Sequence, residues 1–280
     1  LSDLKFYFSS INKKILIDNY PNDFWSNSSA ESLAIIYKAI SKKKQNIYLP
    51  KYFCGQSLKF LRGINAKIIF YDIDKNFNVD YKKLDEVCNI QESDVFVIVH
   101  FFGKINNYDQ LLELKSKINF YIIEDCAHVL AAKFLNGKSD ICNSNYSLFS
   151  FSKFIDCSPL GGLQSSDKDF LKIIDNEINQ SSKLQSIIIN ILIKISRLVK
   201  SNKLLHAKLY SVNYSLWNFP SQNLDNKINF FKKNMKAEMK RRNKKFLLFK
   251  GEIKEKIYQD YFNYDELICQ KLPFVINNEK

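Results

Sequence analysis

The sequence of 280 residues predicts an α/β fold in which a mostly parallel sheet lies between helices. Short apolar segments alternate with helical ones from about residue 28 to residue 165. Apolar runs such as Val95–Val99 are continuous, which is typical of strands buried on both faces of a parallel sheet. Hydrophobic residues make up 46% of the chain, which excludes wholesale disorder and allows a substantial core.

The first helix is expected over residues 28–42, because a serine precedes apolar residues such as Leu33 and Ile36 at helical spacing. The segments that follow keep the alternation. The expected strands are 46–49, 66–71, 95–101, 120–123 and 146–151, and the expected helices are 56–61, 81–87 and 109–114.

The second half of the sequence changes character after residue 168. Residues 168–260 are largely helical and basic in pattern, most densely at 239–245, and an apolar strand is expected at 271–276. Three parts are therefore predicted. They are a large α/β domain at 1–180, a basic helical segment at 181–260 and the start of an incomplete C-terminal small domain at 261–280.

Composition excludes several classes of protein. No apolar run reaches the roughly 18 residues expected of a transmembrane helix, and the strongest one, 187–193, predicts a buried or partner-facing helix. Six cysteines without C-x-x-C spacing indicate reduced thiols and no metal site, and no leader precedes the fold, so the cytoplasm is the expected location. The net charge of +13 suits anionic ligands such as nucleotide-sugars, nucleic acid or lipid head groups without choosing between them.

Two residues carry the chemical prediction. Asp125 ends an apolar run, and Lys153 follows the next expected strand. Ligands of α/β proteins lie at the carboxyl ends of strands. A pyridoxal 5′-phosphate (PLP) enzyme needs an acid for the pyridinium nitrogen and an amine for the Schiff base. The ordinary alternatives are a helix-capping aspartate and a solvated lysine.

Neighbouring residues extend this candidate site. Ser150 stands three residues before the lysine, and His128 lies close enough after the acid to contact the cofactor. The turn at Ser29 and Ala30 opens the first helix, where free N–H groups attract a phosphate. Glu31 in the same turn argues against that role, because a carboxylate repels a phosphate unless it points away.

The chain resembles the DegT/DnrJ/EryC1/StrS family of PLP-dependent sugar aminotransferases over residues 28–166. The resemblance rests on several short motifs in the family's order. These motifs are SSAESLAIIYKAI at 28–40, LPKYFC at 49–54, IFYDID at 69–74, VHFFG at 99–103, IEDCAH at 123–128, and SFSK at 150–153 followed by two glycines at 161–162.

The resemblance implies an aspartate-aminotransferase-like large domain of PLP fold type I, a homodimer, and a role for each matched residue. Lys153 matches the Schiff-base lysine and Asp125 the pyridinium partner. The other implied cofactor contacts are Ser29 and Ala30 at the phosphate cradle, Cys54 near the residue that stacks on the ring, His128 where many members have glutamine, Ser150 at the phosphate, and Asn213, which reaches the neighbouring subunit's cofactor.

The sequence also departs from the family's pattern. Ser29, Ala30 and Glu31 replace the usual cradle residues, the lysine-to-glycine spacing is about one residue longer, and Ser215 stands where an arginine is usual. Family members continue for several dozen residues beyond a segment like 271–276, so a truncated small domain is expected.

The function expected from this resemblance is transfer of an amino group, from glutamate, to a keto-sugar carried on a nucleotide diphosphate. Such a reaction serves surface-polysaccharide or antibiotic-sugar biosynthesis. One alternative is a catalytically inactive relative that acts as a binding or regulatory subunit, which the cradle residues favour. Another is a nucleotide-sugar glycosyltransferase or nucleic-acid binder, but the chain lacks a Gly-rich dinucleotide fingerprint and an RNA-binding motif.

Overall fold

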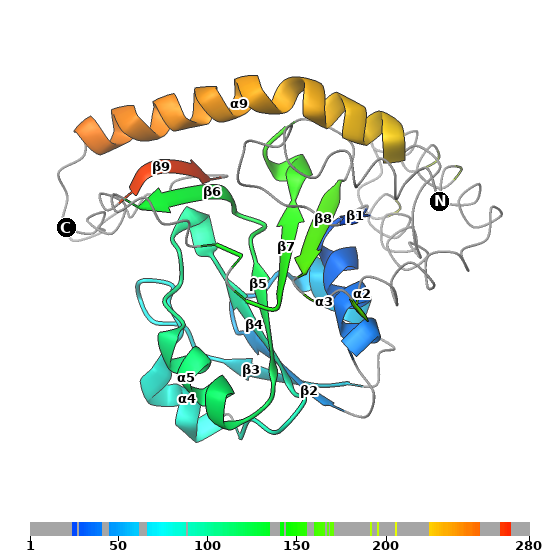
Figure 1. Ribbon diagram of the computed structural model, residues 1–280, viewed down its shortest axis with the longest axis vertical. Helices are drawn as coiled ribbons and strands as arrows, with labels where there is room; N and C mark the ends of the chain where they lie inside the picture. Colours follow the sequence, from blue (N-terminus) through cyan, green and yellow to red (C-terminus); the bar gives the residue numbers. More distant parts are fainter. Residues whose placement is uncertain are drawn as a thin grey trace.

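A computed structural model describes most of the first part of the chain and two later segments (Figure 1). The described residues are 24–170 with gaps at 27, 41–44, 62–65, 88, 135–140, 143, 156–159, 166 and 168, then 224–252 and 264–269, and the single positions 191, 195 and 205.

A seven-stranded sheet forms the centre of the described structure, in the order β1-β8-β7-β5-β4-β2-β3. The five strands β3, β2, β4, β5 and β7 are parallel, and β8 and β1 add antiparallel pairs at one edge. The strands are β1 Phe24–Ser26, β2 Gln45–Pro50, β3 Ala66–Tyr71, β4 Val95–Val99, β5 Tyr121–Asp125, β7 Tyr146–Ser150 and β8 Gly161–Ser165. The mostly parallel sheet is therefore confirmed.

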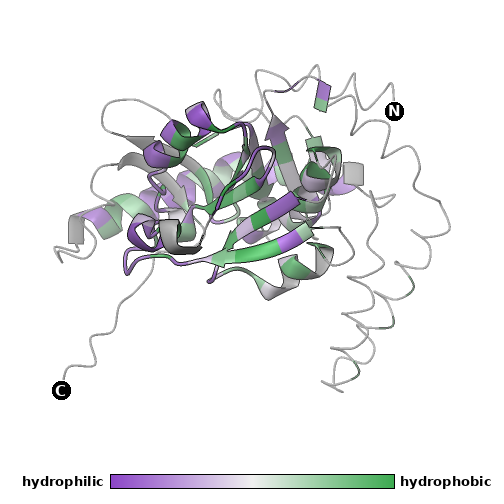
Figure 2. Cartoon of the chain, turned by 90° about the horizontal axis from the view of Figure 1, so that it is seen from below, coloured by the Kyte–Doolittle hydropathy of each residue, from purple (hydrophilic) through white to green (hydrophobic). Residues whose placement is uncertain are grey.

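Helices cover both faces of this sheet, and the alternation of side chains along the strands explains why. In β4, Val95 and Val97 pack with α2, whereas Phe96 and Ile98 pack with α4 and α5. All five residues of β4 are buried, as expected of a central parallel strand. The helices are α2 Ser29–Ile40, α3 Gly55–Leu61, α4 Tyr81–Val87 and α5 Asp109–Lys117. Hydrophobic residues gather in the central strands, with hydrophilic stretches on the surrounding helices and loops (Figure 2).

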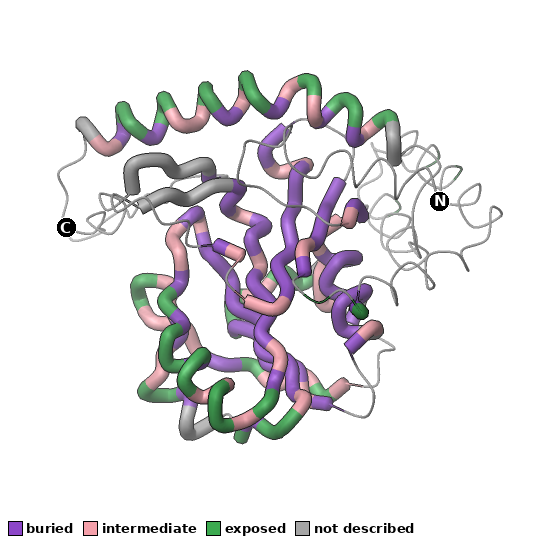
Figure 3. Tube along the Cα trace, viewed as in Figure 1, coloured by how far each residue is buried: buried purple, intermediate pink, exposed green. Residues whose placement is uncertain are grey.

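A third apolar cluster lies where the long helix α9, Leu224–Glu252, crosses one end of the sheet (Figure 1). Its inward residues Ile228, Phe231, Met235 and Met239 recur at helical spacing and are buried, whereas the outward side of the helix is exposed (Figure 3). Packing therefore fixes one face of this basic helix against the large domain.

A two-stranded antiparallel ribbon lies under α9. It consists of β6, Val129–Phe134, and β9, Tyr264–Cys269, with Val129 opposite Cys269. Gly103 accommodates this ribbon, because a Cβ built there would lie 2.3 Å from Cβ of Cys269, and its φ of +86° also favours glycine. Strands β1, β6, β8 and β9 were not predicted.

The expected helices and strands that fall on described residues lie where the structure has them, but some of them end at different residues. The strand expected over 95–101 stops at Val99, because Phe101–Gly103 form the short 3₁₀ helix η1 and Phe102 takes φ 55°. A second short 3₁₀ helix, η2, spans Phe151–Lys153. The strand expected at 271–276 and nearly all of 187–193 lie outside the described residues, and the three-part division of the chain stays a prediction. Among the described helices, none combines the length and apolarity needed to cross a membrane.

Candidate active site

The predicted acid and lysine meet at one edge of the sheet. Asp125 is the last residue of β5, and Lys153 lies in η2, directly after the neighbouring parallel strand β7. Because parallel strands end at the same edge, both residues lie at the carboxyl end of the sheet. The two side chains are close enough for the charge of Lys153 to lower the pKa of Asp125 and for Asp125 to raise that of Lys153.

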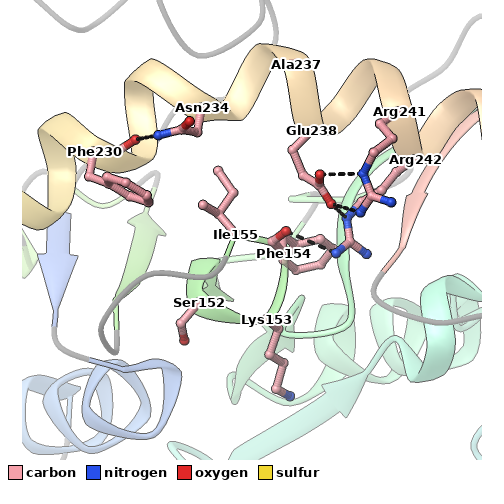
Figure 4. A pocket seen from close by; sticks show the side chains of 10 residues that line it. All are labelled: Ser152, Lys153, Phe154, Ile155, Phe230, Asn234, Ala237, Glu238, Arg241 and Arg242. Carbon is pink, nitrogen blue, oxygen red and sulfur yellow. Dashed lines mark hydrogen bonds and ion pairs between the residues drawn. The ribbon is translucent and has the colours of Figure 1, made fainter.

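The Lys153 amine sits in a partly buried position. Burial lowers the pKa of Lys153 from its ordinary value, and Asp125 and Cys54 act in the opposite direction. Its side chain points away from α9, towards the sheet edge, as Figure 4 shows. A lowered pKa enlarges the fraction of neutral amine, which is the form that attacks a carbonyl carbon.

The Asp125 carboxylate is held by the turn that follows it. Its Oδ1 atom accepts a hydrogen bond from the N–H of Ala127 at 2.8 Å. Burial raises the pKa of Asp125, while the charge of Lys153 and the Ala127 N–H lower it. A further cation beside this carboxylate would favour its ionised form, as a protonated ring nitrogen does.

His128 lies in the same turn with its ring fixed from one side. Its Nδ1 atom accepts a hydrogen bond from the N–H of Phe102 at 3.3 Å, and the two rings stack with centroids 5.6 Å apart. Phe102 has φ 55° and ψ 22°, a left-handed conformation that is strained for a bulky side chain. Burial and the nearby Lys153 cation lower the pKa of His128 to about 4.

We expect His128 to titrate with a midpoint near 4, well below the ordinary histidine value of about 6.5. Because the pKa of His128 is lower in the folded protein than in the unfolded chain, the neutral ring contributes to folding stability above about pH 6.5. This contribution is lost as the pH falls from about 6.5 to about 4. NMR chemical shifts of the ring recorded against pH measure the midpoint. Lys153→Met should raise the midpoint by removing a cation, and a wild-type midpoint near 6.5 would contradict the burial of this ring.

The N-terminus of α2 approaches the lysine segment through Gly161. Ser150 pairs with Gly161 across β7 and β8, and Gly161 pairs with Ser26 across β8 and β1. A Cβ at Gly161 would lie 2.6 Å from the backbone nitrogen of Ser29, so only glycine permits this approach. The cradle predicted at the start of α2 therefore adjoins the strand that carries Ser150.

The backbone at the start of α2 leaves donors for an anion. Ser28 Oγ accepts the N–H of Glu31 at 3.1 Å, while no hydrogen bond among the described residues uses the N–H of Ser29 or Ala30. Free N–H groups at a helix N-terminus attract phosphate. Glu31, which argued against this role, is buried with 3% exposure.

Cys54 is the remaining predicted residue that the structure places near the site. It is exposed, precedes α3, and interacts electrostatically with Lys153. Asn213 lies outside the described residues. The structure thus brings Lys153, Asp125, His128 and Cys54 to one edge of the sheet, and the strand register brings the cradle residues next to Ser150.

The sequence analysis did not predict the hydrogen-bond network around Glu124, the residue that precedes Asp125 in β5. The side chain of Glu124 is fully buried and accepts four hydrogen bonds. The donors are His100 Nε2 at 3.1 Å, Tyr108 Oη at 2.9 Å, the Cys142 N–H at 2.9 Å and the Ser144 N–H at 2.6 Å. Burial alone would raise the pKa of Glu124, but these hydrogen bonds outweigh it and hold the pKa below its ordinary value. The contacts of Glu124 are those of an acid with a structural role.

The same network determines the protonation of His100. The N–H of Asn106 donates to His100 Nδ1 at 3.1 Å, so the ring proton is on Nε2 and is donated to Glu124. Glu124, His100 and Cys126 place potential metal-ligand atoms within 4.8 Å of one another. Both ring nitrogens of His100 are already used, so the described contacts are those of a hydrogen-bond network.

A cavity of about 640 Å³ lies between η2 and α9 (Figure 4). Lys153 and Ser152 line it from the sheet side, and Phe230, Asn234 and Arg241 line it from α9. The lysine segment therefore contacts open space on the side of the long helix as well as the sheet edge.

These residues fit PLP by their chemistry. Asp125 and Lys153 supply the carboxylate and the amine, and the predicted phosphate turn at the start of α2 lies against Gly161, which pairs with Ser150. An acid and a lysine at the carboxyl edge of an α/β sheet are the two side chains that a PLP enzyme needs.

The chain belongs to the DegT/DnrJ/EryC1/StrS aminotransferase family, whose family model matches residues 25–172. Among curated proteins it is 30% identical over 128 residues to the UDP-4-amino-4,6-dideoxy-N-acetyl-beta-L-altrosamine transaminase of Campylobacter jejuni, covering 45% of this chain and 34% of the relative. It is 25% identical over 146 residues to the L-glutamine:scyllo-inosose aminotransferase of Streptomyces griseus, covering 51% and 34%. The chain spans about a third of the length of the curated relatives it matches.

Solved structures share the fold. DesI, crystallised in the presence of its TDP-sugar product, has a TM-score of 0.52 and 19% identity, covering 65% of this chain and 46% of DesI. A DegT DnrJ EryC1 StrS aminotransferase from Brucella abortus has a TM-score of 0.50 and 13% identity, covering 63% and 52%. The predicted PLP fold type I architecture is confirmed by these matches.

Proposed function

We propose that this chain is the cofactor-binding part of a PLP-dependent aminotransferase that acts on a keto-sugar linked to a nucleotide diphosphate. The observation that carries the proposal is the meeting of Asp125 and Lys153 at the carboxyl ends of adjacent parallel strands. Family membership and the fold add independent support.

In this function PLP supplies an electron sink for the negative charge that develops on the carbon bearing the amino group. Lys153 would hold the cofactor through Nζ, and the same atom would carry the proton that moves during amino transfer. Asp125 would keep the ring nitrogen protonated. His128 and Cys54 would make further contacts with the cofactor.

The phosphate and substrate contacts complete the proposal. The N–H groups of Ser29 and Ala30 and the hydroxyl of Ser150 hold the phosphate. Asn213 reaches the cofactor of a second subunit in a homodimer. The names of the relatives in Campylobacter jejuni and Streptomyces griseus support a sugar-type amino acceptor, and glutamate is the proposed donor. A cytoplasmic enzyme with freely diffusing substrates is proposed.

Covalent labelling at Lys153 tests this function. The purified chain is incubated with PLP and reduced with borohydride, and the modified peptide is identified by mass spectrometry. We expect one stoichiometric label on Lys153 and an absorbance near the border of the visible and ultraviolet ranges. The amine is partly buried with a lowered pKa, which favours this residue over exposed lysines.

Matched variants separate a specific label from nonspecific modification. Lys153→Met should abolish the label, whereas Lys51→Met, which removes an exposed lysine paired with Asp72, should leave it unchanged. A label spread over surface lysines, or none, would reject the aminotransferase function. That outcome would favour an inactive family relative.

A further inference from the structure

Arg242 on α9 makes an unusual set of contacts for a residue in a basic helix. Its guanidinium donates from Nη2 to the carbonyl oxygen of Phe154 at 3.0 Å and from Nη1 to that of Cys269 at 2.9 Å. Its Nε atom donates to Glu238 at 2.7 Å, and its side chain is only 17% exposed. The guanidinium also lies 5.2 Å from the centroid of the Phe154 ring. These contacts fix its position, and Figure 4 shows the hydrogen bonds to Phe154 and Glu238.

The first of these partners belongs to the lysine turn. Phe154 directly follows Lys153, and its own N–H donates to Phe151 at 3.0 Å. The carbonyl group that Arg242 holds therefore belongs to the Phe154–Ile155 peptide, one residue beyond Lys153. Arg242 thus restrains the backbone of the turn that carries the Lys153 side chain.

The second partner belongs to a different segment of the chain. Cys269 ends β9 and pairs with Val129, the residue after His128. Cys269 also packs against Gly103, which follows the Phe102 that donates to His128. One guanidinium thus joins the segment that carries the lysine to the ribbon that continues from the His128 turn.

We propose that Arg242 is a positioning residue that holds the Lys153 turn in register with the β6–β9 ribbon. The catalytic importance of this role rests on the proposed function, in which Lys153 holds the cofactor. Only a planar fork of donors reaches two carbonyl groups in different segments while pairing with a carboxylate. A lysine ammonium is a single point charge and does not replace this geometry.

Arg241, the preceding residue, provides a matched control. It also pairs with Glu238, at 2.7 and 2.5 Å, but its side chain is 52% exposed. Among the described residues it makes no hydrogen bond to Phe154 or Cys269. Methionine at either position removes one arginine that pairs with Glu238, whereas only Arg242→Met also removes the two carbonyl contacts and the contact with the Phe154 ring.

The test compares Arg242→Met, Arg242→Lys and Arg241→Met in the full chain. Hydrogen–deuterium exchange on the cofactor-free protein follows the amides of Phe154 and Ile155, both bonded to Phe151. We expect Arg242→Met to speed exchange at these amides about tenfold, which corresponds to losing about 1.4 kcal/mol of local protection. Arg241→Met should change it less than about twofold, and Arg242→Lys should not restore the wild-type rate.

A second readout follows the rate of PLP labelling at Lys153. We expect a loss of about tenfold in Arg242→Met and little change in Arg241→Met. Equal exchange at the turn in both methionine variants would overturn the inference, as would exchange that rises equally in β4, which indicates general loosening. If Arg242→Met does not fold, Arg242→Lys decides by the same measurements. If the wild-type chain takes no label, the aminotransferase proposal fails, and the exchange comparison still decides the role of Arg242 in holding the turn.

Discussion

Replacing Glu124 by alanine is expected to lower the free energy of unfolding by about 3–5 kcal/mol, because it leaves two buried and two partly buried donors without an acceptor. Two of these donors are the side chains of His100 and Tyr108, and two are backbone N–H groups that no rotamer change can redirect. Urea unfolding followed by circular dichroism measures the loss. The substitution should also loosen the start of the turn after Asp125, since the two residues are adjacent in β5.

Two further variants sharpen this prediction. Glu124→Gln keeps one oxygen acceptor and turns an NH₂ group towards donors, so a loss of about 2–3 kcal/mol is expected. Glu113→Gln removes an exposed carboxylate, 70% accessible and paired with Lys117, and should leave the free energy of unfolding close to that of the wild type. A loss below about 1 kcal/mol in Glu124→Ala would show that the network does not stabilise the fold.

Replacing Gly161 by alanine is expected to cost about 3 kcal/mol and to weaken PLP binding. The added Cβ would lie 2.3 Å from the carbonyl carbon of Ser28 and 2.6 Å from the nitrogen of Ser29. Both are backbone atoms, so the N-terminus of α2 must move away from β8. Because the proposed phosphate contacts are N–H groups of this helix, the same movement should reduce the proportion of labelled Lys153 at limiting PLP.

Gly55→Ala is the matched control for this substitution. Gly55 begins α3, and a Cβ there meets nothing within 4 Å. Its unfolding free energy should stay within about 1 kcal/mol of wild type or rise, as the substitution reduces the freedom of the unfolded chain. If both alanine variants behave alike in thermal unfolding and in PLP labelling, the close approach of α2 to β8 is not what forms the cradle.

The parallel core and the acid–lysine pair followed from local patterns in the sequence. Continuous apolar runs such as Val95–Val99 mark buried parallel strands whatever their order, and the ends of such strands meet at one edge. Asp125 and Lys153 each end or follow one of these runs. Their proximity therefore required only that their strands be neighbours, which the register confirms.

The rest depended on contacts that no local pattern encodes. Strand β8 begins with Gly161, and two glycines in succession favour a turn in any single-sequence interpretation. Glu124 accepts a hydrogen bond from the N–H of Cys142, which has a left-handed φ of 67°. It also accepts one from His100, which directly follows strand β4. The left-handed Phe102 likewise has no signature in its residue type, because bulky residues rarely adopt this conformation.

The β6–β9 ribbon has a consequence for how the molecule is made. Residues 130–268 must be synthesised before the strand that contains residue 129 can pair with the strand that ends at residue 269. The strands of the parallel core find their partners earlier, while β6 stays an open edge that invites pairing with other nascent chains. The later strand β9 thus shields an edge that the earlier strand β6 exposes during synthesis.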